Sequence, residues 1–167
     1  MAWSQTAPEL PSGSAWEQEK SVSGWSNHWN FTGKLYIARL NGNQFAIKAE
    51  LTSANGTYGT YYPPAKWKLR CDVGGVTGTE DTSFSVTKGT TTFYFVGEAG
   101  EGVNITVKVG GVGAAVAVQT ATFTAPALLG STLYFKVGGT WKKAALYRKG
   151  GTWKNALAKF KAGGTWK

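Results

Sequence analysis

The chain has 167 residues, 42% of them apolar, and it contains 23 glycines, one cysteine and one histidine. This length allows one domain of ordinary size plus an appendage. The single cysteine excludes an intramolecular disulfide, and one cysteine with one histidine excludes most zinc sites. The first residues lack the basic and apolar regions of a signal peptide, and no run approaches the roughly 18 apolar residues of a membrane span. We therefore expect synthesis in a cytoplasm and no membrane insertion.

The net charge of +9 is confined to one end of the chain. Positions 1–130 hold nine basic and nine acidic residues, so this part is neutral overall. Positions 131–167 hold the other nine basic residues and no acidic residue. The asymmetry separates the final segment from the rest of the chain.

Residues 1–30 are polar and irregular, but they contain Trp3, Trp16, Trp25 and Trp29. Disordered segments carry few aromatic residues. The segment is therefore predicted to be an ordered arm that packs against its own body or a neighbouring subunit. The alternative is that these tryptophans cap the core of the body itself.

Residues 31–126 predict an all-β fold, an antiparallel β-sandwich of immunoglobulin-like or jelly-roll type. Apolar and charged residues alternate from Trp67 to Val73, and 103–109 alternates in the same way. This period of two is typical of strands with one buried and one wet face. Weaker strand signals lie at 34–40, 44–52, 83–87, 91–96 and 114–123, and turn signals at Asn41-Gly42, Asn55-Gly56, Gly74-Gly75, Lys88-Gly89 and Gly110-Gly111. About seven strands fit such a sandwich, and 127–130 is expected to be a linker.

The final segment, 131–167, contains the sequence Gly-Gly-Thr-Trp-Lys three times, at spacings of twelve and thirteen residues. A Gly-Gly pair between β-forming residues favours a two-residue hairpin turn in which both glycines have positive φ. Counting outward from each turn pairs Lys136 with Trp141, Arg148 with Trp153, and Lys161 with Trp166. Cross-strand neighbours of this kind make cation–π contacts. We therefore predict a basic extension of β-hairpin repeats, whose assembly motif comprises Gly138, Gly139, Trp141, Lys142, Gly150, Gly151, Trp153, Lys154, Gly163, Gly164, Trp166 and Lys167.

The repeated Gly-Gly-Thr-Trp-Lys, preceded by the strand-like Leu133-Tyr-Phe-Lys-Val, resembles the tails of virion proteins of tailed bacteriophages. These are minor tail, fibre or decoration proteins. The resemblance covers the last 35 residues or so, and it implies a structural role on the particle, with other virion proteins as partners and often a homo-oligomer. It assigns no catalytic residue, cofactor or metal to this sequence. The expected function is thus that of a virion component made in a host bacterium, and not that of an enzyme.

A carbohydrate-binding adhesin is the alternative. Tyr58, Tyr61 and Tyr62 precede Pro63-Pro64 in a predicted loop, and exposed rings are platforms for the faces of sugars such as a host surface glycan. Trp67 is expected in the core because of its place in an alternating strand.

Nucleic acid is a less favoured partner. The basic, aromatic and acid-free tail has the electrostatic character of a backbone binder. However, its spacing matches no recognition module, and its charges are predicted on both faces of each hairpin. Catalysis is not expected either, because His28 has no nucleophile or carboxylate at a recognised spacing. Two acidic spots, Glu80-Asp81 and Glu98 with Glu101, are interpreted as solvated turns.

Overall fold

A computed structural model describes residues 2–128, 134–137, 140–143, 161–162 and 165–166, with side chains over 2–128. The chain divides into two compact units, Met1–Leu129 and Gly130–Lys167. The described residues are all-β and contain no helix, so none that could cross a membrane.

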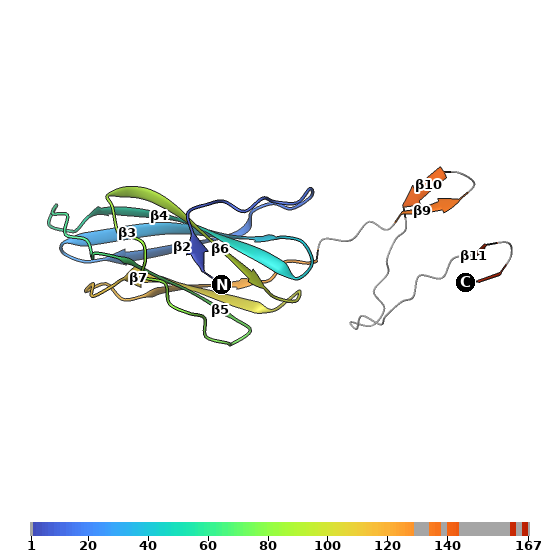
Figure 1. Cartoon of the computed structure of the whole chain (residues 1–167). Coiled ribbons are helices and arrows are strands. Elements are labelled where there is room, and N and C mark those ends of the chain that lie inside the picture. Colours follow the sequence, from blue (N-terminus) through green and yellow to red (C-terminus); the bar gives the residue numbers. More distant parts are fainter. Residues whose placement is uncertain (1, 129–133, 138–139, 144–160, 163–164, 167) are drawn as a thin grey trace. The chain divides into compact units, whose positions relative to one another are not determined.

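The first unit is a β-sandwich of two antiparallel sheets, which confirms the predicted fold class. Figure 1 shows them as two layers, with β5 and β7 beneath β2, β3, β4 and β6. The larger sheet has the strand order β1-β6-β4-β3-β2, and the smaller has the order β5-β7-β8. The strands of the larger sheet are β1 (Trp3–Ser4), β2 (Glu17–Trp25), β3 (Trp29–Arg39), β4 (Gln44–Asn55) and β6 (Gly89–Glu98), and those of the smaller are β5 (Trp67–Val73), β7 (Asn104–Gly111) and β8 (Gln119–Thr124).

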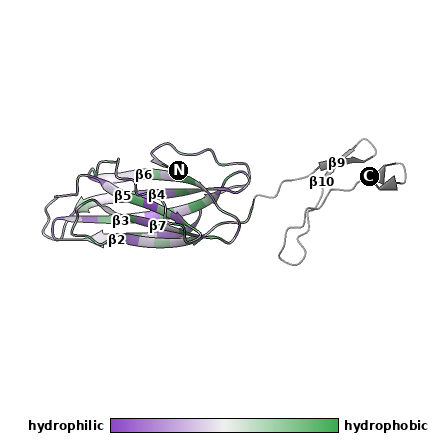
Figure 2. Cartoon of the chain, turned by 60° about the horizontal axis from the view of Figure 1, so that its bottom comes forward, coloured by the Kyte–Doolittle hydropathy of each residue, from purple (hydrophilic) through white to green (hydrophobic). Residues whose placement is uncertain are grey.

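Alternating side chains build the core between the sheets. Along β5, Trp67, Leu69 and Cys71 are buried, whereas the charged residues between them are partly exposed. Figure 2 shows the same alternation as purple and green bands along the strands. The Trp67 ring lies at the centre, with ring centroids of Trp29 and Phe31 at 5.6 and 5.7 Å. Each large apolar side chain buried in this way contributes about 1.5–3 kcal/mol.

The sandwich begins well before residue 31, so the separate arm predicted over 1–30 is corrected. β1 pairs with β6 at the opposite side of the sheet from β2, which pairs with β3. Trp3 and Trp29 are buried in the core of their own chain, as the alternative interpretation held for all four tryptophans, whereas Trp25 is exposed. β2 is not recognisable from the sequence because it is an edge strand. Only Val22 and Gly24 of its nine residues are buried, so its apolar pattern is weak.

Three further expectations for the body are corrected. The strand expected at 83–87 is a loop that bonds to the edge of β5 through the bridges Lys66↔Ser85 and Leu69↔Asp81. The turn expected at Gly110-Gly111 lies inside β7, and the chain turns at the following residues, where Gly113 has φ +68°. Gly111 serves close packing instead, because a Cβ there would overlap Pro64. The strand expected at 114–123 is the shorter β8.

A glutamine side chain joins the edges of the two sheets. Gln18 lies in a bulge of β2 with a positive φ of 54°, which is uncommon for a residue other than glycine. Its amide donates to the Thr124 carbonyl of β8 (2.7 Å) and accepts from the Thr124 N–H (3.2 Å). The side chain thereby does what a neighbouring strand would do, and it satisfies a main-chain donor and acceptor of β8.

A buried arginine fixes the point at which the chain leaves the body. Arg39 is 2% exposed. Its guanidinium donates to the main-chain carbonyls of Asn43 (3.1 Å), Ala99 (2.7 Å) and Pro126 (3.1 Å from Nε). Burial lowers the pKa of Arg39 from its ordinary value. Three segments far apart in sequence are thus held together by one side chain.

The second unit contains two described hairpins. β9 (Tyr134–Val137) pairs with β10 (Thr140–Lys143), and β11 (Lys161–Ala162) pairs with β12 (Thr165–Trp166). Their registers place Lys136 opposite Trp141 and Lys161 opposite Trp166, which confirms the predicted pairing. Outside the described residues lie the middle repeat, with Gly150, Gly151, Trp153 and Lys154, the turn glycines Gly138, Gly139, Gly163 and Gly164, and Lys167.

Candidate ligand-binding cleft

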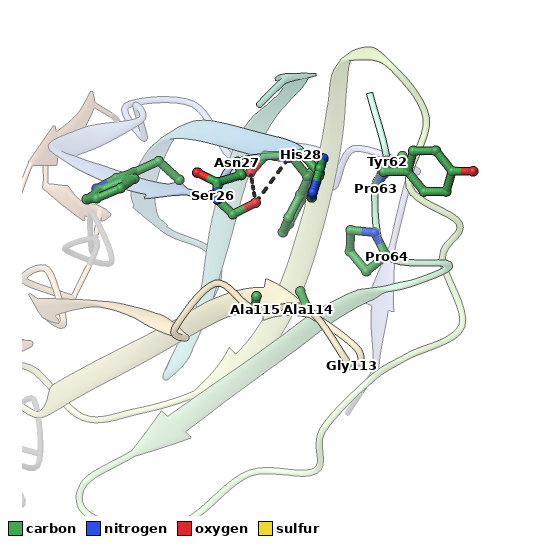
Figure 3. Close-up of a pocket in the computed structure, with 11 residues that line it drawn as sticks. Ser26, Asn27, His28, Tyr62, Pro63, Pro64, Gly113, Ala114 and Ala115 are labelled. Atoms are coloured by element: carbon green, nitrogen blue, oxygen red, sulfur yellow. Dashed lines mark hydrogen bonds between the residues drawn. The ribbon is translucent and has the colours of Figure 1, made fainter. Parts of the chain in front are cut away.

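Three connections meet at one end of the sandwich. The β2–β3 turn (26–28), the β4–β5 loop (56–66) and the β7–β8 loop (112–118) come together there because β2, β4 and β7 all end at that side. Between them lies an open cleft of about 810 Å³. Figure 3 shows its walls, with Asn27 and His28 on one side, Ala114 and Ala115 facing them, and Pro64 beside both. Its lining consists of Trp25, Ser26, Asn27, His28, Trp29, Tyr62, Pro63, Pro64, Gly113, Ala114 and Ala115.

The β2–β3 turn is held by reciprocal hydrogen bonds. The Ser26 hydroxyl donates to the Trp29 carbonyl (2.8 Å) and accepts from the Trp29 N–H (3.0 Å). The Ser26 N–H also donates to Asn30 Oδ1 (2.9 Å). A serine that bonds to nearby main chain in this way stabilises a tight turn. The turn therefore presents Asn27 and His28 in a fixed position.

The β4–β5 loop is bound to that turn through its main chain. The N–H groups of Thr57, Tyr58 and Tyr62 donate to the carbonyls of residues 26, 27 and 28, at 3.0, 3.0 and 2.8 Å. A Cβ at Gly56 would overlap the main chain of residues 27 and 28, so only glycine permits this close approach. Two connections that are distant in sequence thus form one wall.

The third loop is anchored from the other sheet. The Val112 N–H donates to the Lys66 carbonyl (3.0 Å), and Pro64 packs over Gly111. Both contacts tie the β7–β8 loop to the end of the β4–β5 loop. Because each wall is held by main-chain hydrogen bonds or by close glycine packing, the cleft is formed without a ligand.

The cleft is lined mainly by aromatic and small residues. None of its eleven described lining residues is Asp, Glu, Lys or Arg. The side chain of Trp25 is 75% exposed and that of Tyr62 is 81% exposed. His28 Nδ1 lies 3.0 Å from Thr60 Oγ1, and its ring meets the Tyr58 ring edge-on at 5.9 Å.

The three tyrosines singled out in the sequence have different environments. Tyr62 lines the cleft. Tyr58 is exposed but is not part of the lining. Tyr61 is turned toward the body, where its hydroxyl lies 3.0 Å from Ser53 Oγ, which in turn accepts from Trp29 Nε1 at 2.7 Å. Tyr61 therefore has a structural contact in this arrangement.

The cleft residues missed in the sequence are Trp25, Asn27 and His28. The sequence places them in the predicted arm, because the polar residues of β2 before them show no apolar alternation. The available signal was the run Trp25-Ser-Asn-His-Trp29, in which small polar residues between aromatics are typical of a tight turn.

The acidic residues considered as candidate catalytic or cation-binding groups make ordinary structural contacts. Glu80 forms an ion pair with Lys68 (3.1 Å), and Asp81 accepts from the N–H and hydroxyl of Ser83. Within 2–128, no group of three or more His, Cys, Asp or Glu side chains is placed to hold a metal ion. Burial raises the pKa of the Cys71 thiol to about 12, with a further contribution from Asp72.

Among the repeat residues, the described strands contain Trp141 and Lys142 in β10 and Trp166 in β12. Lys142 is paired with Phe135.

No protein-family model matches the chain, and neither curated proteins nor solved structures give a significant match.

Proposed function

We propose that the chain is a structural component of a bacteriophage virion, of tail, fibre or decoration type, that acts by protein–protein assembly and not by catalysis. The observation that carries the proposal is the register of the two described hairpins. In both, a lysine is paired with the tryptophan of a Gly-Gly-Thr-Trp-Lys repeat. This repeat is the feature that resembles phage virion proteins.

The hairpins are well suited to an assembly role because they are too short to be stable alone. Their strands have four residues in β9 and β10 and two in β11 and β12. Isolated two-stranded hairpins are marginal in water, so such elements gain stability by packing on further surfaces. We therefore propose that they bind other copies of the chain and other virion proteins.

The edges of the sandwich also support an assembly role for the hairpins rather than for the body. An exposed edge strand pairs readily with another chain unless it is charged, short or covered. β1 has two residues, β5 is covered by the bridges of Asp81 and Ser85, and β2 carries Glu17, Glu19 and Lys20. These three edges are protected against strand addition, and the fourth, β8, is bonded by the Gln18 side chain at Thr124. We therefore propose the C-terminal hairpins as the assembly element.

The proposal is tested on particles from a bacterial host that produces the chain. After purification on a density gradient, mass spectrometry is expected to detect the chain in the particle fraction. A full-length variant with Trp141, Trp153 and Trp166 changed to Ser should be lost from that fraction. The control Trp25→Ser removes an exposed tryptophan of the body and should be retained. Absence of the unaltered chain from the particles would refute the proposal.

A second candidate function is favoured by the cleft. Exposed aromatic side chains around an uncharged pocket are suited to carbohydrate binding. In that case the sandwich would act as an adhesin module displayed by the same particle.

A further inference from the structure

We propose that the cleft between the β2–β3, β4–β5 and β7–β8 connections binds an uncharged oligosaccharide, with the Trp25 and Tyr62 rings as stacking platforms. The inference rests on the second candidate function and deepens it. It does not depend on the assembly role of the C-terminal repeats.

The exposed aromatic rings gather at one end of the sandwich. Within 2–128, the largely exposed aromatic side chains are Trp25, at the end of β2, and Tyr58 and Tyr62, in the β4–β5 loop. Elsewhere, rings on the outer surface have partners: Trp16 packs on Tyr94 and lies near Lys48 Nζ. Large exposed apolar surface gathered at one place marks a binding site.

The cleft also differs from the outer faces of the sheets in its charge. The outer faces of both sheets carry ion pairs, such as Lys34 with Glu19 and Lys68 with Glu80. The cleft lining has no such residue. A phosphate, a nucleic-acid backbone or an acidic sugar would find no lysine or arginine in the lining. An uncharged ligand does not need charged side chains in order to bind.

Asn27 and His28 provide hydrogen-bonding groups in the cleft. Among the described residues, neither the Asn27 side chain nor His28 Nε2 has a hydrogen-bond partner, although His28 Nδ1 is held by Thr60. A side-chain amide and an imidazole nitrogen both pair with hydroxyl groups. Sugars offer hydroxyls at their edges and apolar C–H groups on their faces, so they match polar groups next to exposed rings.

The walls of the cleft are held in place by contacts within the chain. Main-chain hydrogen bonds and close packing at Gly56 and Gly111 fix its walls. A rigid site loses little conformational freedom when a ligand binds. The volume of about 810 Å³ lies within the usual range of ligand pockets, about 300–1,000 Å³, and suits a short oligosaccharide.

The test is a titration of the full-length chain, followed by the indole N–H resonances of its tryptophans in NMR. The probes are neutral oligosaccharides of glucose, galactose, mannose and N-acetylglucosamine; heparin fragments and single-stranded oligothymidine are the charged comparators. At least one neutral probe is expected to shift an indole resonance that disappears in the variant Trp25→Phe. In Trp25→Ala and Tyr62→Ala the affinity should fall by at least about tenfold.

Trp16→Ala is the control, because it removes a tryptophan ring that packs on Tyr94 and is not part of the cleft lining. Its affinity should stay within about twofold of the unaltered chain. Continued protection of the Cys71 thiol from labelling shows that each variant is folded.

Three results would each overturn the inference: no neutral probe binds at about 10 mM, only a charged probe binds, or Trp25→Ala and Tyr62→Ala bind as tightly as the unaltered chain. Incorporation of the same variants into particles is measured separately. If the unaltered chain is incorporated into particles but binds no neutral probe, the cleft proposal alone is rejected. If the repeat variant is incorporated as well as the unaltered chain, the assembly proposal alone is rejected.

Discussion

The sandwich body and the C-terminal hairpins are both antiparallel β-structure, but they depend on different contacts. The body has a shared core in which rings from β3, β5 and β6 meet, with the Trp67 and Phe93 centroids 6.2 Å apart. The described hairpins consist of one strand pair each, with a lysine opposite a tryptophan. A large core stabilises each strand through many others, whereas a hairpin depends on its own few pairs and on whatever it binds. Changes in the body should therefore unfold it, and changes in the repeats should alter assembly.

The largest effect is expected from removing the first 30 residues. A fragment of residues 31–126 lacks β1, β2 and the buried Trp29. Loss of one such tryptophan costs about 3–5 kcal/mol, against a typical total stability of about 5–15 kcal/mol. The fragment 31–126 should show no cooperative melt by circular dichroism, whereas the fragment 1–128 should. A cooperative melt of the shorter fragment would mean that β1 and β2 are not integral to the body.

Next in size is the change Arg39→Leu. It leaves three main-chain carbonyls without their charged donor, and a hydrogen bond to a charged group is worth about 1.5–3 kcal/mol. Urea unfolding should give a free energy lower by about that amount. The comparison variant Arg39→Lys keeps the charge but not the fork of donors, so it should lose part of the stability. Equal stability of Arg39→Leu and the unaltered chain would count against the anchoring role.

A smaller effect is expected for Gln18→Leu. The change removes both hydrogen bonds to Thr124 and should lower the free energy of unfolding by roughly 1 kcal/mol. Gln18→Gly removes the same bonds but suits the positive φ of 54°, so its loss should be smaller. Thermal melts of the two variants separate the contribution of the hydrogen bonds from the cost of the positive φ. If Gln18→Gly is less stable than Gln18→Leu, the positive φ does not determine which residue suits this position.

The smallest effect on the body is expected from the repeat glycines. Changing Gly138, Gly150 and Gly163 to Val places side chains where the predicted turns need positive φ, at a cost of about 1 kcal/mol or more for each hairpin. The melting temperature of the body should not change, and labelling of the buried Cys71 thiol should stay slow. Faster labelling would show that the repeats contribute to the stability of the sandwich.

The sequence predicts best where a strand has one wet and one buried face. β5 and β7 were found because charged or polar residues alternate with the apolar ones, and the hairpin registers followed from counting outward from a two-residue turn. β2 was missed because its outward positions are polar and two of its inward positions are Val22 and Gly24. The glycines at 110 and 111 mimicked a turn, but Gly111 is required by the contact with Pro64, which is distant in sequence.

The cleft could be predicted only in part, for a related reason. A Tyr-rich loop before two prolines indicated an exposed aromatic site, and Tyr62 lines the cleft. Its partners Trp25 and His28 reach the same place through the pairing of β2 with β3, which no local pattern reveals. The inward position of Tyr61 likewise depends on its contact with Ser53 near the end of β4, the strand that precedes the loop.

The division of labour between body and repeats is tested most directly by the mass of the full-length chain in solution, measured by sedimentation velocity. The account predicts a homo-oligomer for the unaltered chain and a monomer, with an unchanged melting temperature of the body, for the variant with Trp141, Trp153 and Trp166 changed to Ser. A monomeric unaltered chain, or a variant that keeps the oligomeric mass, would contradict it.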